Sequence, residues 1–93
     1  NPAYADAHYG LATIYRQCNE NEMALRAYQK AVECNAQHFE AHYALAVIYY
    51  IDGTFSHART HAALATERFP SAFKLLALIE EELARSTGAH AAS

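Results

Sequence analysis

AHYGLATIY occupies residues 7–15 and returns as AHYALAVIY at residues 41–49. The two stretches lie 34 positions apart, and the same shift aligns residues 1–34 with residues 35–68 at eleven identical positions. Chance would give about three matches in a chain this rich in alanine, so the period marks an internal repeat. Because each unit of a repeat protein packs on its neighbours, the sequence predicts two stacked copies of one structural unit.

Each unit is predicted to contain two helices joined by a short break. The first helix carries apolar side chains at the three- and four-residue spacing of one buried stripe, namely Leu11, Ile14, Tyr15 and Cys18. The polar run of residues 19–21 interrupts this helix, and Asn21 is expected to cap the second one. These features predict a helix-turn-helix hairpin.

The second unit is punctuated in a similar way. Gly53 is expected to end its first helix because glycine tolerates the left-handed conformation, and Thr54 is expected to cap the next. Ser71, after Pro70, is expected to cap a fifth helix that ends near Ser86. The remaining residues of the chain are expected to fray.

These residues resemble the tetratricopeptide repeat, whose helix-turn-helix unit has the same 34-residue length. On the first helix the family pattern asks for a large residue, Leu, a small residue and Tyr, and this chain provides His8, Leu11, Ala12 and Tyr15, then His42, Leu45, Ala46 and Tyr49. On the second helix it asks for Ala, an aromatic residue, Ala and Pro, and the chain provides Ala24, Tyr28, Ala31 and Ala36, then Ala58, Ala62, Ala65 and Pro70. The two histidines replace the usual Trp and are expected to fill packing positions.

The resemblance covers about residues 1–86 and implies a single all-α domain, a right-handed α-α solenoid. Its expected parts are repeat 5–38, repeat 39–72, a capping helix at 72–86 and a frayed tail at 87–93. Asn1-Pro2 aligns with the ends of the two repeats, so we expect the chain to be excised from a longer array with another repeat upstream.

Size and charge exclude several function classes. The 93 residues suffice for one small domain, and 53% hydrophobic residues predict a packed chain. A net charge of −3 argues against a nucleic-acid partner, which selects a basic surface. The longest apolar stretches, residues 43–51 and 75–79, are shorter than the roughly 18 residues of a membrane span, so we expect no membrane insertion by this segment. No compartment follows from the sequence, and the cytoplasm is favoured among the alternatives.

Histidines and cysteines are the candidates for chemistry, but their spacing forms no complete site. His57 and His61 lie four residues apart on a predicted helix, yet no Cys or carboxylate stands where a third metal ligand would be needed. Cys18 and Cys34 are expected at opposite ends of a hairpin, too far apart for a disulfide, so both should be free thiols. We therefore expect no catalytic residue, no metal site, no cofactor and no enzyme activity.

The expected functional surface is the concave face formed by the first helices of the repeats. An apolar strip with hydroxyl groups on this face would suit a peptide or helix of a partner protein. The binding-groove residues predicted from the register are Tyr9, Thr13, Arg16, Gln17, Tyr43, Val47, Tyr50, Ile51, Lys74 and Leu78.

Two functions remain open at this point. The first is a protein-protein interaction scaffold that binds a peptide or helix in the groove. The second is a structural segment of an array, or a self-association module, with no external peptide ligand. The family's basic clamp for chaperone tails is not expected, because only Lys74 matches among its five positions.

Overall fold

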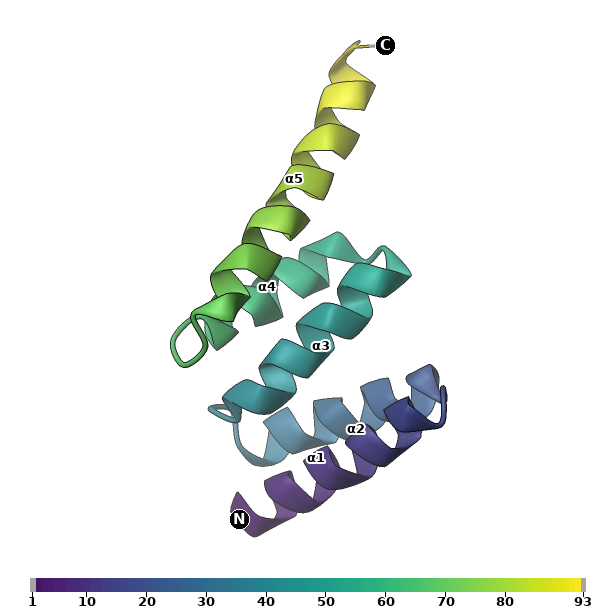
Figure 1. Cartoon of the computed structure of the whole chain (residues 1–93), viewed down its shortest axis with the longest axis vertical. Helices are drawn as coiled ribbons and strands as arrows, with labels where there is room; N and C mark the ends of the chain where they lie inside the picture. The colour runs from purple at the N-terminus through teal and green to yellow at the C-terminus, as the bar shows by residue number, and fades with distance from the viewer. Residues whose placement is uncertain (1, 93) are drawn as a thin grey trace.

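The computed structural model describes the backbone of residues 2–92 and the side chains of residues 3–86. This part of the chain contains no strand and five α-helices: α1 (Pro2–Gln17), α2 (Asn21–Cys34), α3 (Phe39–Asp52), α4 (Phe55–Ala65) and α5 (Ser71–Ala92). The helices stack one after another along a long axis of 49 Å (Figure 1). The predicted all-α helical-repeat class is confirmed, whereas the handedness of the solenoid and the repeat limits stay predictions.

Small residues allow the helices to pack closely. α1 packs on α2, α3 packs on α4, and the two hairpins meet where α2 contacts α3. The alanines expected at these crossings are all fully buried: Ala12, Ala24, Ala46, Ala58 and Ala65. Helix axes approach closely only where the side chains between them are small, so these positions set the spacing of the stack.

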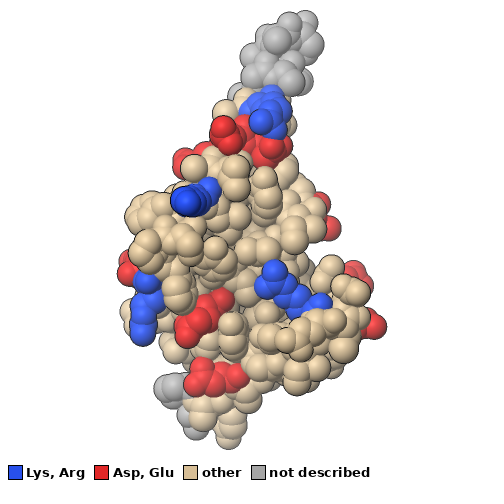
Figure 2. All heavy atoms as spheres, viewed as in Figure 1, with Lys and Arg blue, Asp and Glu red and all other residues tan. Residues whose placement is uncertain are grey.

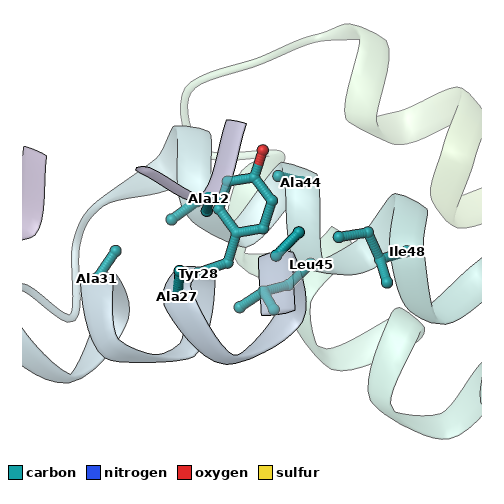
Figure 3. Packing of buried hydrophobic residues seen from close by; sticks show 9 residues of the cluster. Ala12, Ala27, Tyr28, Ala31, Ala44, Leu45 and Ile48 are labelled. Carbon is teal, nitrogen blue, oxygen red and sulfur yellow. The ribbon is translucent and has the colours of Figure 1, made fainter. Parts of the chain in front are cut away.

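The core consists of two clusters. The first lies between α1, α2 and α3 and is centred on Tyr28 and Leu45, the largest fully buried side chains there. Figure 3 shows the Tyr28 ring standing between Ala12 of α1 and Ala44 of α3. The second cluster joins α3, α4 and α5 through Ala46, Ala58, Ala62 and Ile79.

The two hairpins turn at equivalent residues. Gly53 ends α3 in the left-handed conformation, as predicted, with φ of 86°. Asn19 stands 34 positions earlier and also has a positive φ, of 63°. Asparagine is one of the few residues other than glycine that tolerate this conformation, so both units turn with the same backbone geometry.

The predicted N-caps are wrong in detail. Asn21 is already the first residue of α2, and Glu20 holds the cap position without a side-chain hydrogen bond. Thr54 does hold the cap position of α4, but its hydroxyl donates to Asp52 Oδ2 at 3.0 Å instead of capping the helix. The carboxylate of Asp52 competes with the helix for the threonine hydroxyl. The sequence pattern used to predict an N-cap takes no account of such a competitor.

The fifth helix begins at Ser71 itself and extends to Ala92, beyond the predicted end near Ser86. Residues 87–92 were expected to fray and are helical, while residue 93 lies outside the described part of the chain. A single interior glycine such as Gly88 costs a helix about 1 kcal/mol, and the alanines around it are the strongest helix formers. One glycine therefore does not end this helix.

Three of the four residues of the predicted buried stripe of α1 are exposed, while the fourth, Tyr15, is half-buried against the first core cluster. Leu11 is 45% exposed and Ile14 is 58% exposed, and Cys18 also faces outward. Their counterparts one repeat on, Leu45 and Ile48, are 0% and 8% exposed. The difference arises because α2 covers α3, whereas no described element covers the corresponding face of α1. We call the uncovered surface of Tyr4, Leu11 and Ile14 the open face of α1.

Candidate functional site

The main pocket of the molecule is lined chiefly by residues of α1 and α3. These two helices run in the same direction, with α2 behind them (Figure 1). The pocket has a volume of about 420 Å³. The lining residues on α1 follow one another at helical spacing, so a single face of α1 forms one wall. The pocket is lined by Tyr9, Thr13, Arg16, Gln17, Tyr28, Glu40, Tyr43 and Ala44.

A second pocket of about 390 Å³ extends the main pocket toward α5. Tyr9, Glu40 and Tyr43 line both pockets, so the two form one continuous surface. The second pocket adds Phe69 and Ser71 from the connection between α4 and α5. The rings of Tyr43 and Phe69 meet edge to face with centroids 5.9 Å apart. We call the union of both pockets the α1/α3 groove.

Partly buried hydrogen bonds hold the floor of the groove. The Thr13 hydroxyl donates to the carbonyl of Tyr9 at 3.0 Å. Because its one proton is used there, the Thr13 oxygen accepts the hydrogen bond from the Tyr28 hydroxyl, 3.2 Å away. Tyr28 is only 1% exposed, and its ring also packs on Tyr9 with centroids 5.6 Å apart. The floor is thus uncharged and rigid.

Opposite charges border the groove around Tyr9. Burial raises the pKa of the Tyr9 phenol, and Tyr28 and Glu40 raise it further, while the Thr13 hydrogen bond and Arg16 act in the opposite direction. The phenol therefore stays protonated at neutral pH and can donate a hydrogen bond to a ligand. Both charged side chains are exposed at the rim.

Five of the ten predicted groove residues come together in the main pocket: Tyr9, Thr13, Arg16, Gln17 and Tyr43. The other five lie elsewhere. Val47 is half-buried on α3, and Lys74 and Leu78 are exposed on α5. Tyr50 packs on Phe55 of α4, with ring centroids 5.8 Å apart. Ile51 lines a separate pocket of about 270 Å³ near the α1–α2 turn.

Sequence reasoning missed groove residues that come from other helices and turns. Tyr28 was expected only as a packing residue of α2, and Phe69 and Ser71 lie around the proline that ends the second unit. Glu40 and Ala44 follow the same helical register as Tyr43. An aromatic residue directly before Pro70 was the available signal for Phe69.

A stack of aromatic rings joins α3 to α4 beside the groove. His42 Nε2 donates to the carbonyl of Ala36 at 2.8 Å, since a carbonyl only accepts. His42 Nδ1 is then the acceptor, and His61 Nδ1 donates to it at 2.9 Å. The His42 and His61 rings stack with centroids 5.1 Å apart, and Tyr49 stacks on His61. The expected packing role of His42 is confirmed by its 4% exposure.

His61 is held neutral by this arrangement. Burial lowers its pKa from the usual 6.5 to about 4, and the neighbouring His42 and His57 lower it in the same sense. A neutral ring suits the hydrogen bond to His42, because only one proton can lie between the two Nδ1 atoms.

His38 caps α3 and connects it to α1. Its Nδ1 accepts a hydrogen bond from the backbone of Ala41 at 3.2 Å, so the proton resides on Nε2. That nitrogen donates to Asp6 Oδ1 on α1 at 2.9 Å. His38 is buried, and the sequence analysis assigned it no role.

No metal cluster occurs among the described residues, where three or more His, Cys, Asp or Glu side chains never gather closely enough to hold an ion. Cys18 and Cys34 are free, exposed thiols, as expected. Within the described helices, none combines the length and apolar character needed to cross a membrane. Lys and Arg side chains appear as separate spots on the face shown in Figure 2.

Antiparallel helices that stack as equivalent hairpins, with a groove between the first helices, define a helical-repeat protein. Comparison with protein families matches residues 12–53 to the TPR repeat. This match supports assignment to the tetratricopeptide repeat family, and the matched residues run from the middle of α1 to the turn after α3. No curated protein matches the sequence.

Proposed function

We propose that the α1/α3 groove binds a peptide or helix of a partner protein. Tetratricopeptide repeats are generally protein-protein interaction modules, and the family typically provides a non-catalytic scaffold. The observation that carries this proposal is the continuous, preformed groove in which Tyr9, Tyr43 and Phe69 offer aromatic surface above a rigid floor. Aromatic side chains supply large apolar contact areas together with hydroxyl donors, which is the chemistry that peptide grooves use.

The test is photo-crosslinking from inside the groove. One variant carries a benzophenone side chain at position 43. The control variant carries it at position 60, where Thr60 is exposed on α4. Each variant is irradiated in lysate of the source organism. We expect a discrete crosslinked partner from position 43 only. The partner is then purified and its binding to the Tyr43→Glu and Thr60→Glu variants is compared. Equal binding of the partner by both variants would refute the groove as the binding site.

The open face of α1 favours a second candidate function, self-association or packing within an array. Leu11 and Ile14 match Leu45 and Ile48, which are buried in the core shared with α2, so a helix like α2 is the element expected to pack on the open face. Sedimentation velocity of the chain and of its Leu11→Asp variant tests this. We expect a concentration-dependent dimer that the variant loses. A monomer at all concentrations would exclude self-association of this chain.

A further inference from the structure

The main pocket of the α1/α3 groove carries a positive charge at one end and a negative charge at the other. Arg16 lies in the last turn of α1, and Glu40 lies in the first turn of α3. Since α1 and α3 run in the same direction (Figure 1), these turns are at opposite ends of the main pocket. Glu40 is the repeat equivalent of Asp6, which precedes Arg16 by ten residues, or about 15 Å of helix.

Neither charge is neutralised within the described part of the molecule. Arg16 has no ion-pair partner there. Glu22 and Asp52 line the separate pocket that also contains Ile51, and neither forms an ion pair with Arg16. Among the described residues, the only cationic group within ion-pair distance of Glu40 would be His38, whose Nδ1 lies 3.9 Å from the carboxylate. That nitrogen accepts the backbone hydrogen bond of the α3 cap and therefore carries no proton. Both charges remain available to a ligand.

The part of the main pocket between Arg16 and Glu40 is uncharged. The rings of Tyr9 and Tyr43 line it, and the hydroxyls of Thr13 and Tyr28 are engaged with each other. An apolar side chain pays the smallest desolvation free energy on entering such a surface, because the surface offers no charged partner to a polar group. Selectivity for charge therefore resides at the two ends.

We propose that the groove selects an extended peptide segment with one acidic and one basic side chain, separated by about four or five residues and with an apolar residue between them. This inference rests on the proposed function of the groove. The acidic side chain pairs with Arg16 and the basic one pairs with Glu40. An extended chain advances about 3.3 Å per residue, so four or five residues span the distance between the two charged turns.

The probe is an array of eight-residue peptides that contain leucine and two charged residues at every spacing. The charged residues are Asp with Lys, Asp with Asp, or Lys with Lys. We expect the wild-type chain to prefer the mixed peptides at the predicted spacing by about fivefold, the effect of an exposed ion pair of about 1 kcal/mol. This preference should fall as salt is raised, because exposed charges are screened.

Charge exchange at the two ends gives the decisive comparison. Arg16→Glu makes both ends acidic and should shift the preference to peptides with two lysines. Glu40→Lys makes both ends basic and should shift it to peptides with two aspartates. The combined Arg16→Glu and Glu40→Lys variant should restore the preference for mixed peptides. Arg59→Glu, on exposed surface of α4, is the matched control and should leave the preference unchanged.

The outcomes separate the two proposals. If peptides bind and Tyr43→Glu abolishes their binding, but neither charge exchange nor salt changes the preference, the charge inference is wrong and the groove remains. If the wild-type chain binds no peptide of the array and yields no crosslink from position 43, the groove function itself is wrong. Circular dichroism of each variant shows whether it is folded, and the salt dependence of the wild-type chain tests the inference without any substitution.

Discussion

At the scale of single residues, His61 is the group whose protonation should control stability in mild acid. The unfolded chain protonates this ring near its usual pKa of 6.5, whereas the folded chain resists protonation down to about 4. The unfolded state therefore binds more protons between these values, so the contribution of His61 to stability is complete above pH 6.5 and is lost as the pH falls toward about 4. The groups that face the ring are His42 and Tyr49 on α3 and His57 on α4.

Urea unfolding at about pH 7.5 and about pH 5 measures this effect. We expect the midpoint of the wild-type chain to fall between the two pH values, and the midpoint of His61→Leu to fall less. His8→Leu, which removes a half-buried histidine of α1, should keep the wild-type fall. If His61→Leu lost as much stability as the wild-type chain, another group would be responsible.

At the scale of helices, His38 should control how α3 starts. His38→Ala removes the N-cap of α3, which costs about 0.5–2 kcal/mol, and it also breaks the connection to Asp6 on α1. Asp6→Ala removes only that connection, which is partly exposed and contributes at most about 1 kcal/mol. Urea unfolding of the two single variants and of the double variant gives the three free energies. An Asp6→Ala loss equal to that of His38→Ala would mean that the cap contributes nothing.

The helices themselves could be predicted from the sequence, because alanines at helix crossings and left-handed residues at turns must recur with the period. Asn19 and Gly53 show this, since they turn the chain alike in both units. Caps were less predictable, as Thr54 shows, because the hydroxyl finds a competing acceptor in Asp52. The exposure of Leu11 could not be predicted, since its sequence pattern is the same as that of buried Leu45. Burial depends on what packs against a helix, not on the helix alone.

At the scale of the whole molecule, half of the groove was predictable. Residues such as Thr13 and Arg16 follow from the register of one helix, which fixes the face on which a side chain lies. Tyr50 follows the same register but turns to Phe55, because α4 crosses α3 close to that position. Tyr28 and Phe69 enter the groove from outside the first helices. Their contributions depend on the packing between hairpins, which no single-helix pattern contains.

Tyr49 connects the two halves of the molecule. It packs against both core clusters, its hydroxyl accepts a hydrogen bond from Gln29 of α2 at 2.8 Å, and its ring lies on His57 and His61 of α4. In a repeat protein the stabilities of units and of the interfaces between them add, and the interfaces make unfolding cooperative. Tyr49→Ala should therefore cost about 2 kcal/mol, as expected for a half-buried large side chain, and should also uncouple the two hairpins.

Native-state hydrogen exchange distinguishes uncoupling from simple destabilisation, because it reports the opening free energy of each helix separately. In the wild-type chain we expect the most protected amides of α2 and α4 to share one opening free energy. In Tyr49→Ala the amides of α2 should open at a lower free energy than those of α4. Tyr50→Ala is the matched control, since Tyr50 packs only against the cluster of α3, α4 and α5. This variant should lower protection around that cluster and leave the contact between α2 and α3 intact. If α2 and α4 still opened together in Tyr49→Ala, the coupling would reside in the buried alanines of the α2–α3 contact instead of in this ring.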